Sequence, residues 1–106
     1  MPTLITDGST TTDGTEQTLA TDTANHTYVF VIDTNLMVNG DQIEIKIKTI
    51  VRSAGTERVA YVVQYANIQD DPQKYSMPVP ANISLKVTLK RVAGTDHAYP
   101  CALLSL

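Results

Sequence analysis

Polar and apolar residues alternate along the segment from Gln42 to Arg52. Because successive side chains of a β-strand point to opposite faces, this alternation predicts a strand with one buried face and one solvated face. A turn at Ser53–Thr56 and another alternating segment, Arg58 to Ala66, complete a predicted hairpin. The residues of its first strand that are expected to point inward are Ile43, Ile45, Ile47, Thr49 and Val51.

Two further segments have the pattern of strands. Residues 83–90 alternate again, with Ile83, Leu85, Val87 and Leu89 expected to point inward. A turn at Ala93–Thr95 then leads into a final apolar strand from about Ala98 to Leu106. Proline has no amide proton for a ladder, so Pro100 predicts that this last strand lies at a sheet edge or starts late. The run from Tyr28 to Ile32 is apolar on both sides, which predicts a central strand or one that faces a partner.

The first 23 residues follow a different pattern. They are rich in threonine, lack helical periodicity and contain the turn dipeptides Asp7-Gly8 and Asp13-Gly14. They predict an extended N-terminal arm (1–23), with short strands at Leu4-Ile5 and Thr15 to Thr21, ahead of a β-sandwich domain (24–106). The predicted fold is therefore all-β, a small antiparallel β-sandwich or barrel of about six to eight strands. Deletion of residues 1–14 is expected to leave this domain folded.

Charge is distributed unevenly along the 106 residues, although the net charge is only −3. Residues 1–45 carry seven acids and no Lys or Arg, whereas residues 46–106 carry eight bases and four acids. We expect the bases to form a positive sheet surface that meets carboxylates, either of the chain's own arm or of a neighbouring copy. The residues assigned to these contacts are Asp7, Asp13, Glu16, Asp22, Lys46, Lys48, Arg52, Lys86, Lys90 and Arg91.

No group of residues in the sequence points to catalysis, a cofactor or a metal. Cys101 is the only cysteine and lies in an apolar strand, where a small buried side chain is expected. His26 and His97, at a strand start and in a turn, are interpreted as solvated residues without further metal ligands. The Asp70–Pro72 segment is interpreted as the start of a loop. We therefore expect a protein that is not an enzyme and has no cofactor.

The same composition argues against several classes of partner. No segment has the length of a membrane span or the pattern of a secretory signal, which predicts a soluble protein made in the cytoplasm. Nucleic-acid binding needs a net positive domain, and the net charge of −3 argues against it. The sequence has no tryptophan for a sugar-stacking platform.

Motifs from one end of the chain to the other form a further pattern. They are the Thr-rich start with Asp13-Gly14-Thr15, the segment Tyr28–Thr34, Asn39-Gly40-Asp41, Ser53–Thr56, Lys74–Pro80 and the ending Leu103–Leu106. Together they resemble a family of short proteins found among tailed-bacteriophage virion genes. The resemblance covers nearly the whole chain, and its motifs are turns and strand edges. Family members tend to have a large aromatic residue where this chain has Cys101.

The resemblance implies a capsid cement, or decoration, protein that binds the outside of the major capsid shell and clamps adjacent capsomers. Its implied partners are the major capsid protein and neighbouring copies of itself, in a homo-oligomer that is a dimer or a trimer. The implied location is the virion exterior, after synthesis in the host cytoplasm. The alternative is a phage tail or fibre component, or another β-sandwich module that contacts a host surface or a glycan.

Overall fold

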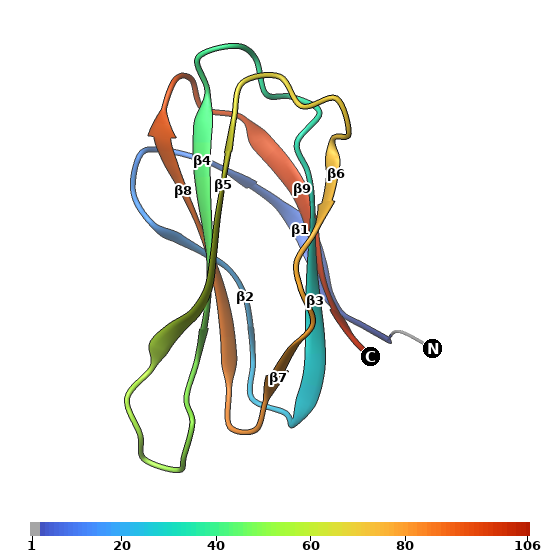
Figure 1. Cartoon of the computed structure of the whole chain (residues 1–106), viewed down its shortest axis with the longest axis vertical. Helices are drawn as coiled ribbons and strands as arrows, with labels where there is room; N and C mark the ends of the chain where they lie inside the picture. Colours follow the sequence, from blue (N-terminus) through green and yellow to red (C-terminus); the bar gives the residue numbers. More distant parts are fainter. Residues whose placement is uncertain (1–2) are drawn as a thin grey trace.

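Two antiparallel β-sheets pack face to face in the computed structural model, which describes residues 3–106 (Figure 1). The described residues form no helix, and therefore none long and apolar enough to span a membrane. The strands are β1 (Thr3–Thr11), β2 (Gln17–Asp22), β3 (His26–Asp33), β4 (Gln42–Thr49), β5 (Arg58–Ala66), β6 (Gln73–Tyr75), β7 (Val79–Ala81), β8 (Leu85–Ala93) and β9 (Ala98–Ser105). The predicted all-β sandwich is confirmed.

The two sheets differ in how they are assembled. Sheet A has the strand order β1-β9-β3-β6, with β7 also paired with β3, and sheet B has the order β2-β8-β4-β5. The strands outnumber the predicted six to eight because the proline-rich segment forms β6 and β7 as well as loops. Each of these has three residues, and together they pair with the two ends of β3.

The core between the sheets is built from the alternating residues of the long strands. Its large members include Tyr28, Phe30, Ile32, Ile43, Ile45, Ile47, Leu85, Val87, Leu89, Tyr99 and Leu103. This confirms the inward faces predicted for β4 and β8. Val51 differs, with 79% of its surface exposed, because β4 ends at Thr49 and the chain turns into a hairpin that projects beyond the other strands (Figure 1).

Most of the stretch predicted as an N-terminal arm lies inside the two sheets. Residues 3–11 pair with β9 and residues 17–22 pair with β8, while residues 1 and 2 lie outside the described part. Both predicted short strands are present, yet they are edge strands of the sandwich and do not stand apart from residues 24–106. Threonine favours strands, but a polar edge strand carries little hydrophobic alternation, so the sequence pattern resembles that of an arm.

Pro100 lies in a central strand, so the first of the two predicted alternatives, an edge strand at the C-terminus, is wrong. β9 runs between β1 and β3 and begins at Ala98. Its pairing with β3 begins only at Cys101, whereas its pairing with β1 includes Pro100 and Ala98. Pro100 therefore has a paired strand on one side only, and the missing amide proton is tolerated at that position.

Candidate interaction surfaces

The outer face of sheet B carries a cluster of four lysine side chains. Lys86 lies opposite Lys48 in the register of β8 and β4, and Lys90 lies opposite Glu44. Ile43, Ile45 and Ile47, which alternate with the charged residues along β4, point into the core, so the charged side chains point outward. We call this surface the basic face and define it by Lys46, Lys48, Lys86 and Lys90.

Glu16 is the acid of the N-terminal stretch that meets the basic face. Its carboxylate forms an ion pair with Lys48, with a distance of 2.5 Å between Oε1 and Nζ. Hydrogen bonds from Lys48 and Thr88, aided by the charges of Lys48 and Lys46, lower the pKa of Glu16 despite partial desolvation. At this position the chain's own acid meets its own basic face, which is one of the two arrangements expected from the sequence.

The other three acids assigned to contacts lie elsewhere. Asp22 accepts a 2.6 Å hydrogen bond from the Tyr28 hydroxyl, at the turn between β2 and β3. Asp13 accepts hydrogen bonds from the amide and the hydroxyl of Thr15, and these bonds lower its pKa. Asp7 lies on β1 in sheet A, opposite Ala102.

Two of the assigned basic residues also lie off the basic face. Arg52 is exposed in the projecting hairpin between β4 and β5. Arg91 lies opposite Ile43, on the inner side of sheet B, and its Nε is 2.9 Å from Asp96 Oδ1. Arg91 also donates to the Gly94 carbonyl, so it holds the β8–β9 turn together.

The outer face of sheet A is apolar over most of its width. Cross-strand register aligns Leu4 with Leu104 and Val29 in one row, and Ala102 with Val31 and Tyr75 in the next. Leu4 is 54% exposed and Tyr75 is 62% exposed. We call this surface the apolar face and define it by Leu4, Val29, Val31, Tyr75, Ala102 and Leu104.

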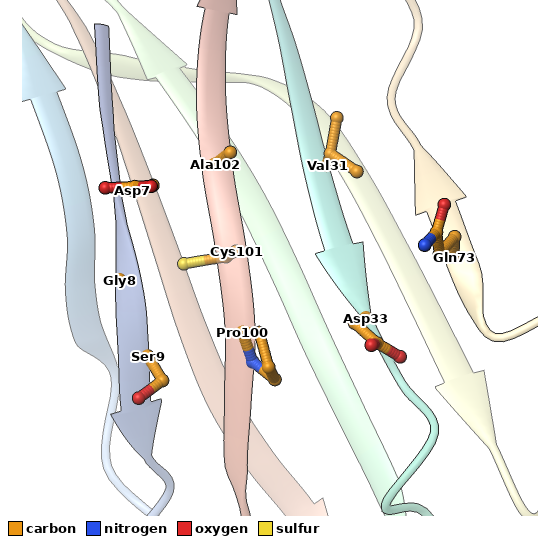
Figure 2. Close-up of a pocket in the computed structure, with 9 residues that line it drawn as sticks. All are labelled: Asp7, Gly8, Ser9, Val31, Asp33, Gln73, Pro100, Cys101 and Ala102. Carbon is orange, nitrogen blue, oxygen red and sulfur yellow. The ribbon is translucent and has the colours of Figure 1, made fainter. Parts of the chain in front are cut away.

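An open groove of about 610 Å³ lies at one end of the apolar face (Figure 2). Asp7, Asp33 and Pro100 line it, and the Cys101 sulfur points toward β1, where Gly8 lies opposite (Figure 2). Cys101 is only half-buried. Desolvation, with the nearby Asp7 charge, raises the pKa of the Cys101 thiol. The thiol form is therefore favoured over the nucleophilic thiolate.

A buried carboxylate that sequence reasoning did not identify lies at one end of the sandwich. Asp41 is 2% exposed and accepts hydrogen bonds from the Val38 amide and from both the amide and the hydroxyl of Thr95. His97 Nε2 lies 2.9 Å from Asp41 Oδ2. Burial by itself raises the pKa of Asp41, but these hydrogen bonds outweigh it and lower the pKa to about 2.

This cluster contains a hydroxyl, an imidazole and a carboxylate, yet its geometry is that of a clamp. A catalytic triad uses both imidazole nitrogens, one for the nucleophile and one for the carboxylate. Here Thr95 Oγ1 and Asp41 Oδ2 both contact Nε2 of His97, at 3.0 and 2.9 Å. The cluster instead joins the β3–β4 connection to the β8–β9 turn. His97, predicted to be a solvated turn residue, is half-buried as part of this clamp.

The sequence does not predict the clamp, because Asp41 is more than fifty residues away from Thr95 and His97. The local signals were the Asn39-Gly40-Asp41 turn and Gly94, which has a φ of +89° and lies against the Asp41 carboxylate. Neither signal indicates that the two turns meet.

Neither a possible metal site nor the comparison with known proteins indicates a role for these surfaces. Within residues 3–106, no three His, Cys, Asp or Glu side chains are grouped so that they could hold a metal ion. Comparison of the chain with protein-family models, with curated proteins and with solved structures gave no match.

Proposed function

We propose that this protein is a structural virion protein that binds the outside of a tailed-phage capsid shell and cements adjacent capsomers. The apolar face is the observation that carries the proposal. Leu4 and Tyr75 are more than half exposed and lie in register with Val29, Val31 and other apolar side chains. A contiguous apolar patch on a small protein marks a surface that another protein covers.

The basic face supplies a second surface of different chemistry on the opposite side of the sandwich. The two outer faces point away from each other on opposite sides of the sandwich (Figure 1). A small module with one apolar and one basic face suits a protein that lies on a shell and also contacts a neighbouring subunit. The resemblance of the sequence motifs to those of tailed-phage virion proteins supports the same role.

Cementing follows from mass action. A protein that binds the assembled shell but not its separated subunits stabilises the shell by its own binding free energy, repeated over many copies. On this proposal, the apolar face contacts the shell. The basic face meets carboxylates of the shell or of neighbouring copies.

Adding the purified protein back to particles that lack it tests the proposal. Wild-type protein should sediment with the shells. Leu4→Lys on the apolar face should weaken attachment about tenfold, the effect of losing roughly 1.4 kcal/mol. Val92→Lys, at a position 46% exposed on β8, is the matched control and should attach normally.

Two results would overturn this proposal. Wild-type protein that stays in the supernatant is not a shell-binding protein. Protein that attaches only to tailed particles, and to a few sites on each, is a tail or fibre component instead.

A further inference from the structure

β5 forms an edge of sheet B, and among residues 3–106 it pairs only with β4. Its residues 59–66 include no charged residue and no proline. Val59 and Val62 are 45% and 48% exposed on its outer side. A long edge strand of apolar, strand-favouring residues presents a row of backbone donors and acceptors that another strand can pair with.

The other sheet edges carry features that discourage such pairing. β1 has a register shift between Leu4 and Thr6 and contains Gly8. β2 has a register shift between Thr18 and Ala20, and β6 and β7 have three residues each. Bulges, glycine and short strands are devices that protect edges from pairing. In β5 the register shift lies near Ala60, and the ladder from residue 61 to residue 66 is regular.

The inner side of β5 is also incompletely covered. Tyr61, Val63 and Tyr65 point toward the core but remain half-buried. Their cross-strand neighbours on β4 are exposed by only 1–2%. Lys74 Nζ lies 5.5 Å from the centroid of the Tyr65 ring, which places a flexible, charged side chain against this part of the core. A strand added beside β5 would extend the sheet and cover more of this apolar row.

The sequence of β5 suits pairing with a second copy of itself. Residues 60–66 read Ala-Tyr-Val-Val-Gln-Tyr-Ala, which is nearly the same in reverse. Antiparallel pairing about Val63 places Tyr61 opposite Tyr65 of the second copy, with both rings on the inner side. Aromatic cross-strand pairs of this kind stabilise a sheet. A second copy of this chain can therefore supply the pairing strand, because both copies offer the same surface.

Charges on the outer side agree with the same register. Within sheet B, Lys46 lies opposite Val62 and Glu44 lies opposite Gln64. Pairing about Val63 places Val62 opposite Gln64 of the second copy. The row that contains Lys46 then continues into the row that contains Glu44 of the second copy, so that opposite charges are aligned and like charges are offset.

We propose that β5 is a two-fold interface at which a second copy of this chain adds its own β5 in antiparallel register, centred on Val63. The two four-stranded B sheets become one continuous sheet. Such a pairing uses the same surface on both copies, so it closes at the dimer. This proposal does not depend on a role at a capsid shell.

Analytical ultracentrifugation of wild-type and variant protein tests the interface. Wild-type protein should sediment as a dimer. Val62→Lys should give a folded monomer, because pairing about Val63 makes position 62 a diagonal neighbour of its own copy and opposes like charges. The matched control is Leu4→Lys, which places the same charge on an exposed apolar residue of sheet A and should remain dimeric. A wild-type monomer, a trimer, or a dimer lost only with Leu4→Lys would overturn the proposal.

Cross-linking tests the register without relying on a charged variant. In a Cys101→Ser background, Val63→Cys should form an intermolecular disulfide, because residue 63 faces itself across the two-fold axis. Val59→Cys is the control, since the two copies of residue 59 would be separated by eight residues, about 27 Å along the strands. Equal cross-linking of the two variants, or cross-linking of Val59→Cys alone, would contradict the proposed register.

Discussion

The Asp41 carboxylate shows how a single residue joins segments that are distant in the sequence. It accepts hydrogen bonds from two backbone amides, from the Thr95 hydroxyl and from His97. A buried charge is tolerated only when such donors replace water. The clamp therefore stabilises the turns at one end of the sandwich and has no need of a bound partner.

Asp41→Asn should destabilise the protein by about 2 kcal/mol, because one carboxylate oxygen is replaced by an amide group that cannot accept from Val38 and His97. Urea unfolding of the wild type and the variant at neutral pH measures the difference. A variant as stable as the wild type would show that the clamp contributes nothing to folding.

The same substitution should reveal that the stability contributed by Asp41 depends on pH. The Asp41 pKa is lowered from 3.8 to about 2 in the folded chain, so the unfolded chain binds the proton first as the pH falls. The stability that Asp41 contributes is complete above its ordinary pKa and is lost as the pH falls toward 2. The stability difference between wild type and Asp41→Asn should therefore shrink over this range; a constant difference would contradict the pKa shift.

Gly94 and Gly40 provide a matched pair for the packing around the clamp. Both have positive φ, +89° and +98°, but an added Cβ meets the Asp41 side chain at Gly94 and open space at Gly40. Gly40→Ala should cost about 1–2 kcal/mol from backbone strain alone. Gly94→Ala should cost roughly 2 kcal/mol more, because its Cβ would also overlap the Asp41 carboxylate and the backbone of Gly40 and Asp41. Equal melting temperatures for the two variants would show that the Gly94 contact is unimportant.

At the scale of elements, β1 and β2 complete the two sheets along the edges of β9 and β8. β1 runs beside the whole length of β9, whose Tyr99 and Leu103 belong to the core. Without β1, this edge of β9 would be unpaired along its length. A chain without its N-terminal residues is therefore expected to lose stability, contrary to the expectation from the sequence.

Deletion of residues 1–14 should lower the melting temperature by more than 10 °C or abolish cooperative unfolding, because the ladder between β1 and β9 is lost. Thermal unfolding followed by circular dichroism measures this effect. Deletion of residues 1 and 2 alone is the control and removes no described strand residue. A truncated chain with the melting temperature of the wild type would mean that residues 3–14 act as a separable arm.

How well the sequence predicts a strand depends on its pattern of burial and on its length. β4 and β8 were predictable because burial on one face imposes a strict alternation of apolar residues, such as Ile43, Ile45 and Ile47. β6 and β7 have three residues each, too few for any alternation to be visible. Glu16 was predicted as a contact residue, but the pairing of strands, which local sequence does not encode, selects Lys48 as its partner.

The whole molecule presents surfaces of different chemistry on its two sides. Each follows from the strand alternation that also builds the core, because residues between the buried positions must point outward. On sheet B these residues include the four lysines of the basic face, and on sheet A they are mainly apolar. The chain thus offers one side suited to apolar contact and one suited to carboxylates, as the proposed attachment to a protein shell requires.

Quantitative mass spectrometry of purified phage particles tests the proposed cement function most directly, because a cement protein repeats with the capsid lattice. We expect this chain to be present in a fixed ratio to the major capsid protein, of the same order as the number of capsomers. Its absence from the particles, or its presence in only a few copies per particle, would contradict the proposed function.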